Sequence, residues 1–376
     1  MTTARVAVVG AGPGGLAAAL RLKERAGDQI EVLLFEKEAM AEYLPGTISV
    51  FMGQTTRERW RRRLNLGGLK VRFGEADEVS GGGVRIEGEW VEADAVIASP
   101  GLALAPGRVP DAPNVHTFWD PEGAERASEA ARGLRGGTVA VVVSSLPYRG
   151  PAAPYGVAME LAAYCRREGR DARVVLTTPE EVPLASIGGG VPEFLRSSCA
   201  AVGVGILNGF EPDLPRLENG RLCSRGGVEV GCDLAFVVPP HERSPLLARL
   251  PGGGPLAPVS PRFESARPNL FVVGDAAMTP LPRAADVAAA GGRTAADAAL
   301  EGLGHSGGCE PHPPAPECYL PHGGGSYSRI SLRYPNGLPP RARPEVSLEG
   351  PSERLAAGFE ASFDRWRKLS EGERVG

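Results

Sequence analysis

The feature that most constrains the fold is the N-terminal run RVAVVGAGPGGLAAALRLKE. Its hydrophobic residues 5–9 predict a buried parallel strand, and residues 16–24 predict a helix. The glycines between them have the spacing G-x-G-x-x-G. We expect Gly10 to form the tight turn, Gly12 to let the backbone approach a pyrophosphate, and Gly15 to permit close packing of helix on strand.

The residues around this loop strengthen the prediction of a dinucleotide site. Pro13 and Gly14 open the helix, whose free N–H groups and dipole favour phosphate oxygens. A second strand is expected at residues 31–35 and ends in Glu36, followed by Lys37. An acidic residue about 20 or more positions beyond the glycines binds a ribose hydroxyl in such sites. We therefore assign Glu36 and Lys37 to the cofactor site.

Two later segments favour FAD over NAD. Residues 94–101 predict a strand that ends in a small-residue turn, and residues 269–277 predict a strand that ends in Gly-Asp. Both resemble motifs of flavoproteins with two dinucleotide-binding domains, in which the Asp contacts the ribityl chain of FAD. The Gly allows close approach and the carboxylate accepts from a hydroxyl. A helix N-cap is the alternative role for the Asp. The expected cofactor residues are Pro100, Gly101, Gly274 and Asp275.

The order of these segments predicts an α/β chain with two Rossmann-like, dinucleotide-binding-type domains. The FAD-binding domain is expected to be discontinuous, with residues 1–107 forming its first part and 243–303 its second. Residues 108–242 form the second domain, and 304–376 a Gly/Pro/His-rich C-terminal segment. In the second domain, strands are expected at 139–143, 173–177 and 234–238, with helices near 155–167 and 192–202.

The second domain lacks a glycine-rich phosphate loop. After its first strand the chain reads SSLPYRGPAAPY, residues 144–155. The prolines remove N–H donors that a phosphate needs, and the bulky Leu146 and Tyr148 block close approach. We do not expect NAD(P)H to bind there.

That segment carries a family resemblance. LPYRGPAAPY resembles the L-P-Y-[KR]-C-P-P-x-P-Y motif of sulfide:quinone oxidoreductases and flavocytochrome c sulfide dehydrogenases. TPLPRA at 279–284 and ECY at 317–319 resemble two further motifs of this family, in the family's order. The resemblance covers nearly the whole chain. It implies an FAD-dependent oxidoreductase that passes electrons from sulfide or a related sulfur compound through FAD to quinone or another acceptor.

The family uses a pair of thiols beside the flavin, and this chain departs from that pattern. Cys318 matches the second thiol, whereas Gly150 stands in the place of the first. Cys309, nine residues upstream of Cys318, could substitute if its loop folds back, or either cysteine could have no role. Arg283, after Pro282, stands where the family usually has Lys. A cation there is expected to stabilise negative charge on the reduced cofactor and to favour the Cys318 thiolate.

Two other interpretations remain open. A type II NADH:quinone oxidoreductase-like enzyme is disfavoured by the missing second glycine loop. A non-catalytic flavin-binding redox sensor or scaffold is favoured by the missing cysteine. We expect FAD to be bound non-covalently, since the covalent link of some relatives uses an N-terminal cysteine and no cysteine precedes Cys165. There is no CxxC pair, so no metal site is predicted. We expect four cysteines to be buried and to act as small hydrophobic side chains: Cys165, Cys199, Cys223 and Cys232.

Charge and hydropathy limit the partners. The net charge of -4 gives no indication of nucleic acid binding, and no apolar run approaches the roughly 18 residues of a spanning helix. The chain enters a strand at once, so we expect a cytoplasmic protein. The sequence does not indicate an oligomeric state.

Two features allow peripheral contact with the inner face of the membrane. The basic run Arg57–Arg63 follows Thr55 and Thr56, which form a helix-cap pattern. The run is either attracted to anionic lipid head groups or forms a solvated helix face. A C-terminal helix is expected over 353–369, and ordinary packing on the protein body is the alternative to an interfacial role. Its apolar face consists of Leu355, Phe359, Phe363 and Trp366.

Overall fold

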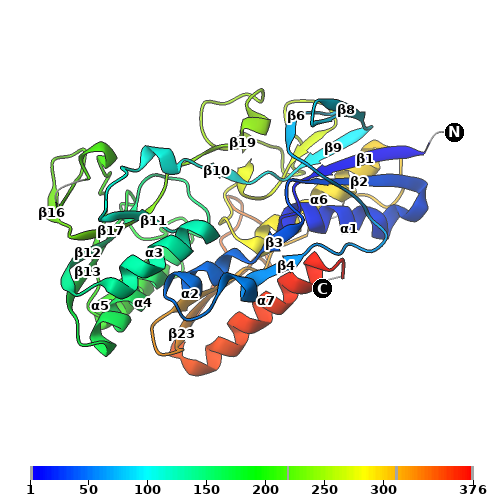
Figure 1. Cartoon of the computed structure of the whole chain (residues 1–376). Coiled ribbons are helices and arrows are strands. Elements are labelled where there is room, and N and C mark those ends of the chain that lie inside the picture. The colour runs from blue at the N-terminus through cyan, green and yellow to red at the C-terminus, as the bar shows by residue number, and fades with distance from the viewer. Residues whose placement is uncertain (1–2, 218–219, 310–311, 374–376) are drawn as a thin grey trace.

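A computed structural model describes residues 3–217, 220–309 and 312–373 of the chain. It contains two α/β units, each built on a five-stranded parallel sheet, which lie side by side (Figure 1). The predicted α/β fold with two Rossmann-type sheets is confirmed. The first sheet has the order β20-β9-β1-β2-β5. Its strands are β1 (Ala4–Val9), β2 (Ile30–Glu36), β5 (Lys70–Phe73), β9 (Ala95–Ala98) and β20 (Leu270–Val272).

The central strand β1 is buried on both faces, as its continuous hydrophobic run predicts. Val6 and Val8 point to one face, which is covered by α1 (Pro13–Ala26) and α6 (Ala285–Gly302). Ala7 and Val9 point to the other, towards a small antiparallel sheet. That sheet consists of β6 (Ala76–Ser80), β7 (Gly83–Ile86) and β8 (Glu89–Glu92). A Cβ on Gly292 of α6 would lie 2.0 Å from the carbonyl oxygen of Gly14, so glycine permits close contact of the two helices.

The second sheet has the order β11-β17-β12-β13-β14. Its strands are β11 (Val115–Thr117), β12 (Gly136–Val143), β13 (Asp171–Thr177), β14 (Gly205–Leu207) and β17 (Leu234–Val238), and its helices are α3 (Pro121–Gly133), α4 (Ala153–Arg167) and α5 (Val191–Ala201). All three strands and both helices expected for this unit are present. The chain enters and leaves the unit through β10 (Leu102–Leu104) and β18 (His241–Arg243), which pair antiparallel.

The C-terminal segment contains an antiparallel sheet that the sequence did not predict. It consists of β22 (Glu317–Pro321), β23 (Tyr327–Arg333) and β24 (Glu345–Ser352). The strand β22 packs against α4 of the second unit, where a Cβ on Gly156 would lie 2.7 Å from Pro321. This sheet therefore fixes the position of Cys318, which lies on β22.

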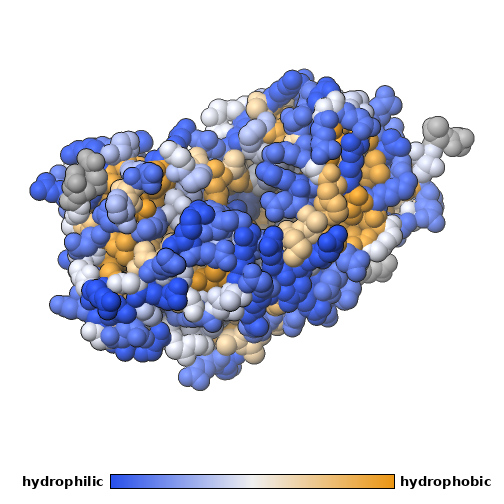
Figure 2. All heavy atoms as spheres, viewed as in Figure 1, coloured by the Kyte–Doolittle hydropathy of each residue, from blue (hydrophilic) through white to orange (hydrophobic). Residues whose placement is uncertain are grey.

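The C-terminal helix α7 (Ala356–Ser370) buries its apolar face against the protein body. Tyr43 lies 5.3 Å, ring centre to ring centre, from Phe363 and 5.6 Å from Trp366. Phe359 packs at 5.7 Å from Trp60. The outward side of the helix is mostly hydrophilic (Figure 2). The interfacial-helix interpretation is thus wrong, because the face it needs is already covered. None of the helices among the described residues is long and apolar enough to cross a membrane.

The basic run does not form the predicted α-helix. Residues Arg57–Trp60 form a single 3-10 turn, and β4 (Arg61–Arg63) pairs with β3 (Met40–Glu42). Thr56 precedes the turn without a side-chain cap bond. Trp60 is only 4% exposed, because it fills the space beside Gly46. Burial of this one aromatic side chain outweighs the weak helical preference of the charged residues around it.

Candidate functional site

The loop after β1 has the shape of a dinucleotide cradle. Gly10 has a φ of +96°, and a Cβ on it would lie 2.4 Å from the carbonyl oxygen of Ser99. A Cβ on Gly15 would lie 1.8 Å from the carbonyl oxygen of Gly10, so only glycine fits both positions. A Cβ on Gly12, in contrast, would meet nothing within 4 Å. The loop is therefore open at the position where a pyrophosphate approaches the helix start.

Glu36 lies at the edge of this cradle. Its carboxylate accepts hydrogen bonds from the backbone N–H groups of Ala11 and, at 2.7 Å, Lys37. These contacts hold the end of β2 against the glycine loop, where the ribose-binding acid of a dinucleotide site belongs. Lys37 instead extends into solvent, where its ammonium group pairs with Glu75 at 3.3 Å.

The ends of β9 and β20 complete the rim of the cradle. Pro100 and Gly101 follow β9, and Gly274 and Asp275 follow β20, its neighbour in the sheet. A Cβ on Gly274 would lie 3.5 Å from the Ser99 hydroxyl. Asp275 is not a helix N-cap, because α6 begins ten residues later and its cap residue is Ala284. Burial raises the pKa of Asp275, although Arg149 and Arg283 oppose this shift.

The corresponding loop of the second unit is closed by its own side chains. Tyr148 is 3% exposed, and its hydroxyl donates to the carbonyl oxygen of Pro151 at 2.9 Å. The guanidinium of Arg149 donates to the carbonyl oxygen of Trp119 at 2.5 Å. The helix α4 then begins at Ala153 without a glycine cradle. At the start of this helix the N–H of Ala153 is bonded to the carbonyl oxygen of Gly150 at 2.8 Å, and Pro154 has no N–H.

Three motif segments that are far apart in the sequence meet at the start of α6. The N–H of Gly150 donates to the carbonyl oxygen of Arg283 at 3.2 Å. Burial raises the pKa of Asp286, and the charge of Arg365 and a hydrogen bond with the backbone of Glu317 partly offset this effect. Asp286 also acts electrostatically on the Cys318 thiol. The loop after β12, the segment after β20 and the strand β22 thus form one site beside the cradle.

The surroundings of Cys318 disfavour its thiolate form. Burial, together with the carboxylates of Asp286 and Glu317, raises its pKa to about 11. Arg283 is not among the charges that act on it; burial lowers the pKa of Arg283 itself, and Asp275 opposes that shift. The expectation that Arg283 favours the thiolate has no support from these contacts, because the charges that act on the sulfur are those of Asp286 and Glu317.

The backbone at Gly150 is adapted to glycine. Its φ is +61°, a left-handed conformation that other residues adopt at a cost of about 1–2 kcal/mol. The space itself is sufficient, since a Cβ would lie 3.7 Å from Ala153 and 3.9 Å from Trp119. The missing cysteine is thus matched by a loop conformation that disfavours a cysteine.

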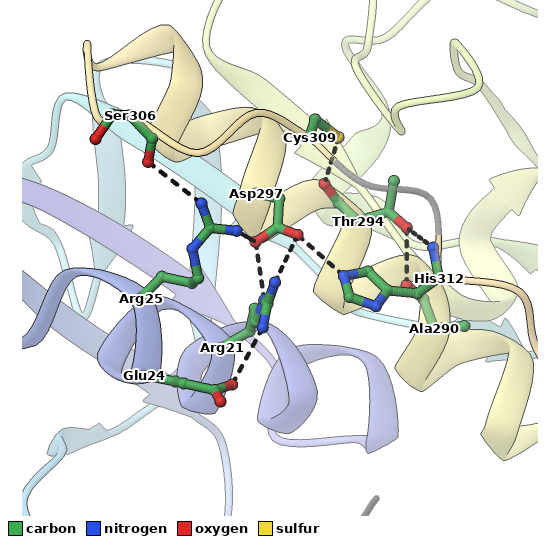
Figure 3. Close-up of polar contacts among 9 residues, drawn as sticks. All are labelled: Arg21, Glu24, Arg25, Ala290, Thr294, Asp297, Ser306, Cys309 and His312. Carbon is green, nitrogen blue, oxygen red and sulfur yellow. Dashed lines mark hydrogen bonds and ion pairs between the residues drawn. The ribbon is translucent and has the colours of Figure 1, made fainter.

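Cys309 lies beside Thr294, in the middle of α6 (Figure 3). Its thiol donates to the carbonyl oxygen of Thr294 at 3.5 Å and packs against the hydrophobic core of the first unit, whereas Cys318 packs against that of the second. Thr294 is eight residues beyond Asp286 on α6, a rise of about 12 Å. The structure does not bring the two cysteines together, so Cys309 is not positioned as a partner thiol. The other cysteines, Cys165, Cys199, Cys223 and Cys232, are buried as predicted.

The sequence did not identify three residues of this site. Asp286 lies three positions beyond Arg283, at the start of α6, and Arg149 lies inside the quoted LPYR motif. Both could have been found from their place in these motifs. His241, on β18, is 5% exposed and interacts electrostatically with Arg149 and Arg283. No spacing in the sequence connects His241 with the other two.

Comparisons with known proteins agree with this architecture. The family model described as NAD(P)-binding Rossmann-like domain matches residues 8–40, and no curated protein matches the sequence. The sulfide:quinone oxidoreductase of the hyperthermophilic bacterium Aquifex aeolicus is similar with a TM-score of 0.81 at 16% identity, over 98% of this chain and 92% of that chain.

Two further structures share the fold. A ferredoxin reductase from Rhodopseudomonas palustris has a TM-score of 0.65 at 15% identity, over 88% of this chain and 82% of that chain. A NAD-dependent persulfide reductase from A. fulgidus has a TM-score of 0.62 at 16% identity, over 88% and 64% of the two chains. The chain therefore has the two-domain dinucleotide-binding fold of these oxidoreductases, and the likeness suggested by the sequence motifs is confirmed at the level of fold.

Proposed function

We propose that the protein is an FAD-dependent oxidoreductase. It would pass electrons from sulfide or a related sulfur compound through FAD to a quinone or another acceptor. The observation that carries this proposal is the meeting of Gly150, Arg283 and Cys318 segments at the start of α6, directly after the cradle. A dinucleotide cradle alone fits many activities, whereas a thiol held beside it fits sulfur chemistry.

The residues present fit FAD, bound non-covalently. The open position at Gly12 suits the pyrophosphate, and the Asp275 carboxylate at the end of β20 suits a ribityl hydroxyl. When bound, FAD supplies a two-electron acceptor. Arg283 is the cation that would stabilise negative charge on it. The full set of proposed cofactor residues is Gly10, Gly12, Pro13, Gly14, Gly15, Glu36, Lys37, Pro100, Gly101, Gly274, Asp275, Pro282 and Arg283.

Cys318 acts as the nucleophile in this proposal, and Asp286 prepares it. Because burial raises the pKa of Asp286, its carboxylate is a stronger base than that of an exposed Asp. It would take the Cys318 thiol proton and produce the reactive thiolate. Gly150 supplies no second thiol, so sulfur carried by Cys318 would leave to an external acceptor such as sulfite or a small thiol.

The location remains part of the proposal. We place the protein in the cytoplasm, with peripheral contact at the inner face of the membrane if the acceptor is a quinone. The membrane contact is proposed only because a quinone is a membrane-dissolved acceptor. The helix α7 gives no support for it, since its apolar face is buried.

Anaerobic flavin bleaching tests the function. The FAD-loaded protein is mixed with sulfide and, separately, with NADH, and the visible absorbance of the flavin is followed. Bleaching by sulfide alone is expected. Bleaching by NADH alone would instead identify an NADH-oxidising enzyme, and bleaching by neither would identify a non-catalytic flavin protein.

A further inference from the structure

We propose that Arg365 of the C-terminal helix α7 is a positioning residue for the thiol chemistry. Its guanidinium holds the strand that carries Cys318 and keeps the Asp286 carboxylate ionised, so that this carboxylate can accept the thiol proton. The use of the thiol in catalysis rests on the proposed function, whereas the position of Arg365 rests on contacts among α7, β22 and the start of α6.

Arg365 reaches from α7 to the residue directly before Cys318. Its Nη2 atom lies 3.5 Å from Oε2 of Glu317, the first residue of β22, and donates to the hydroxyl of Ser362 on its own helix at 3.0 Å. The side chain of Glu317 is 16% exposed and that of Arg365 is 40% exposed. Because Glu317 and Cys318 are consecutive, this ion pair fixes the start of the thiol-bearing strand against α7.

The Glu317 carboxylate also has partners within its own sheet. Its Oε1 atom lies 3.3 Å from Nη1 of Arg329 and 3.9 Å from Nη2 of Arg333, both on β23. The hydroxyl of Tyr319 donates to Oε2 at 3.2 Å. These contacts balance the charge of Glu317 without α7, so the charge of Arg365 is able to act on a second carboxylate as well.

The second carboxylate is Asp286, at the start of α6. Burial raises its pKa, and among the groups that oppose this shift the charge of Arg365 ranks ahead of the hydrogen bond with the backbone of Glu317. A cation supplied by α7 therefore offsets the burial that would otherwise favour the protonated acid. The charged and titratable groups that act on Asp286, or on which it acts, are Arg365 from α7, Glu317 and Cys318 from β22, Arg293 from α6 and Tyr43, which follows β3.

The step that Arg365 assists is a proton transfer, Cys318–SH + Asp286–COO⁻ → Cys318–S⁻ + Asp286–COOH. Both sides hold the same number of protons, so the reactive form is equally available at every pH at which Asp286 is ionised and Cys318 is still protonated. The rate of a thiolate reaction should therefore be level in this range and fall on its acid side, where Asp286 takes up a proton. Removing a cation beside a carboxylate raises the pKa of the carboxylate, which moves this fall to higher pH.

The test measures the reactivity of Cys318 as a function of pH by two readouts. The first is alkylation of the FAD-free protein by iodoacetamide, an uncharged probe, in a Cys309→Ser background, with the labelled residue located by mass spectrometry. The second is anaerobic bleaching of the FAD-loaded protein by sulfide. The ionisation of sulfide is the same for every variant, so a difference between two bleaching profiles belongs to the protein.

We expect Arg365→Gln to move the acid side of both profiles to higher pH by roughly half a unit to one unit, because a partly exposed guanidinium is screened by water and salt. A shift of this size lowers the rate about three- to tenfold at a fixed pH on the acid side. Arg365→Lys keeps the charge and should stay closer to the wild type. Arg367→Gln is the matched control and should leave the profiles unchanged, since Arg367 lies on the same helix but pairs with Asp364 and Glu371.

Glu317→Gln should shift the profiles in the opposite direction. The charge of Glu317 raises the pKa of Asp286, so its removal should move the acid side to lower pH. Arg365→Gln and Glu317→Gln remove the same ion pair, and a purely structural role of this pair predicts the same change in both variants. Opposite shifts therefore distinguish the effect of charge from the effect of lost structure, and either variant alone still tests the sign if the other does not fold.

A wild-type alkylation profile without an acid side overturns the inference. Profiles that do not move in Arg365→Gln, that move equally in Arg367→Gln, or that move in the same direction in Glu317→Gln also overturn it. The proposed function fails separately: if sulfide does not bleach the wild type but the alkylation profiles shift as expected, the role of Arg365 stands and the sulfide oxidation is wrong. Bleaching by sulfide with unshifted profiles gives the reverse result.

Discussion

Replacing Asp297 by Asn tests how the structure holds the two helices that flank the cradle. The Asp297 side chain is fully buried on α6 and accepts hydrogen bonds from Arg21 on α1 at 2.9 and 3.1 Å (Figure 3). It also accepts from Arg25 at 3.2 Å and lies 3.0 Å from Nε2 of His312. This one carboxylate therefore connects α1, α6 and the segment that leads to β22.

The expected loss follows from the burial of the partners. Removing one member of a fully buried ion pair costs about 3–5 kcal/mol. The side chains of Arg21 and Arg25 are 18% and 22% exposed, so water partly stabilises them after the change. We therefore expect Asp297→Asn to lower the free energy of unfolding by about 2–3 kcal/mol. Glu24→Gln, which removes the exposed partner of Arg21 at 3.3 Å, should cost under about 1 kcal/mol.

The effect should also depend on pH. Burial alone would raise the pKa of Asp297, but hydrogen bonds from Arg21 and His312 hold it below its usual value of 3.8. A carboxylate with a lowered pKa stabilises the folded state above its unfolded pKa and loses this contribution as the pH falls through its folded pKa. Urea unfolding at pH 7 and at successively lower pH should show the two proteins converging below pH 3.8. An Asp297→Asn loss no larger than that of Glu24→Gln at pH 7 would refute the reasoning.

The cradle, α7 and His241 give three further predictions. Gly12→Ala should fold normally but bind FAD more weakly, whereas Gly15→Ala should disrupt the first unit. Flavin retention and circular dichroism distinguish the two effects. The same flavin retention and the same spectrum in both variants would contradict the geometry. Phe363→Ala should cost about 3–5 kcal/mol of stability and leave liposome binding unchanged, because the ring packs on Tyr43; reduced liposome binding by the folded variant would restore the membrane interpretation. Burial lowers the pKa of His241 from 6.5 to about 4, so the wild type should lose about 3 kcal/mol of stability as the pH falls through that window. His241→Gln should remove most of this dependence of the unfolding free energy on pH. An unchanged dependence would show that His241 is not the titrating group.

The sequence predicted the parts of the fold that local rules determine. The loop from Gly10 to Gly15 could be predicted because the spacing of its glycines between a strand and a helix is recognisable within one short window of sequence. The strands β12, β13 and β17 could be predicted because strands buried on both faces read as continuous hydrophobic runs. In these regions, sequence and structure agree without information from distant residues.

The remainder depended on contacts between distant segments. The strands β22 and β24 contain charged residues, and β24 includes the Gly350-Pro351 pair, so their pairing has little local signal. Trp60 changed the conformation of the basic run because it packs against Gly46 and α7, which no window around residue 60 reveals. The cluster of Arg149, His241 and Asp275 is assembled from three separate segments, so only the folded chain shows it.

The most direct test of the account is the rate of anaerobic flavin reduction by sulfide in two cysteine variants. Cys318→Ser and Cys309→Ser are matched changes at thiols of the same C-terminal segment, and both proteins should retain FAD, since neither cysteine is one of the cradle residues. The account predicts that stopped-flow mixing with sulfide bleaches the wild type and Cys309→Ser at the same rate, whereas Cys318→Ser stays oxidised. Bleaching of Cys318→Ser at the wild-type rate would contradict the account, because the thiol beside the start of α6 would then have no part in the reaction.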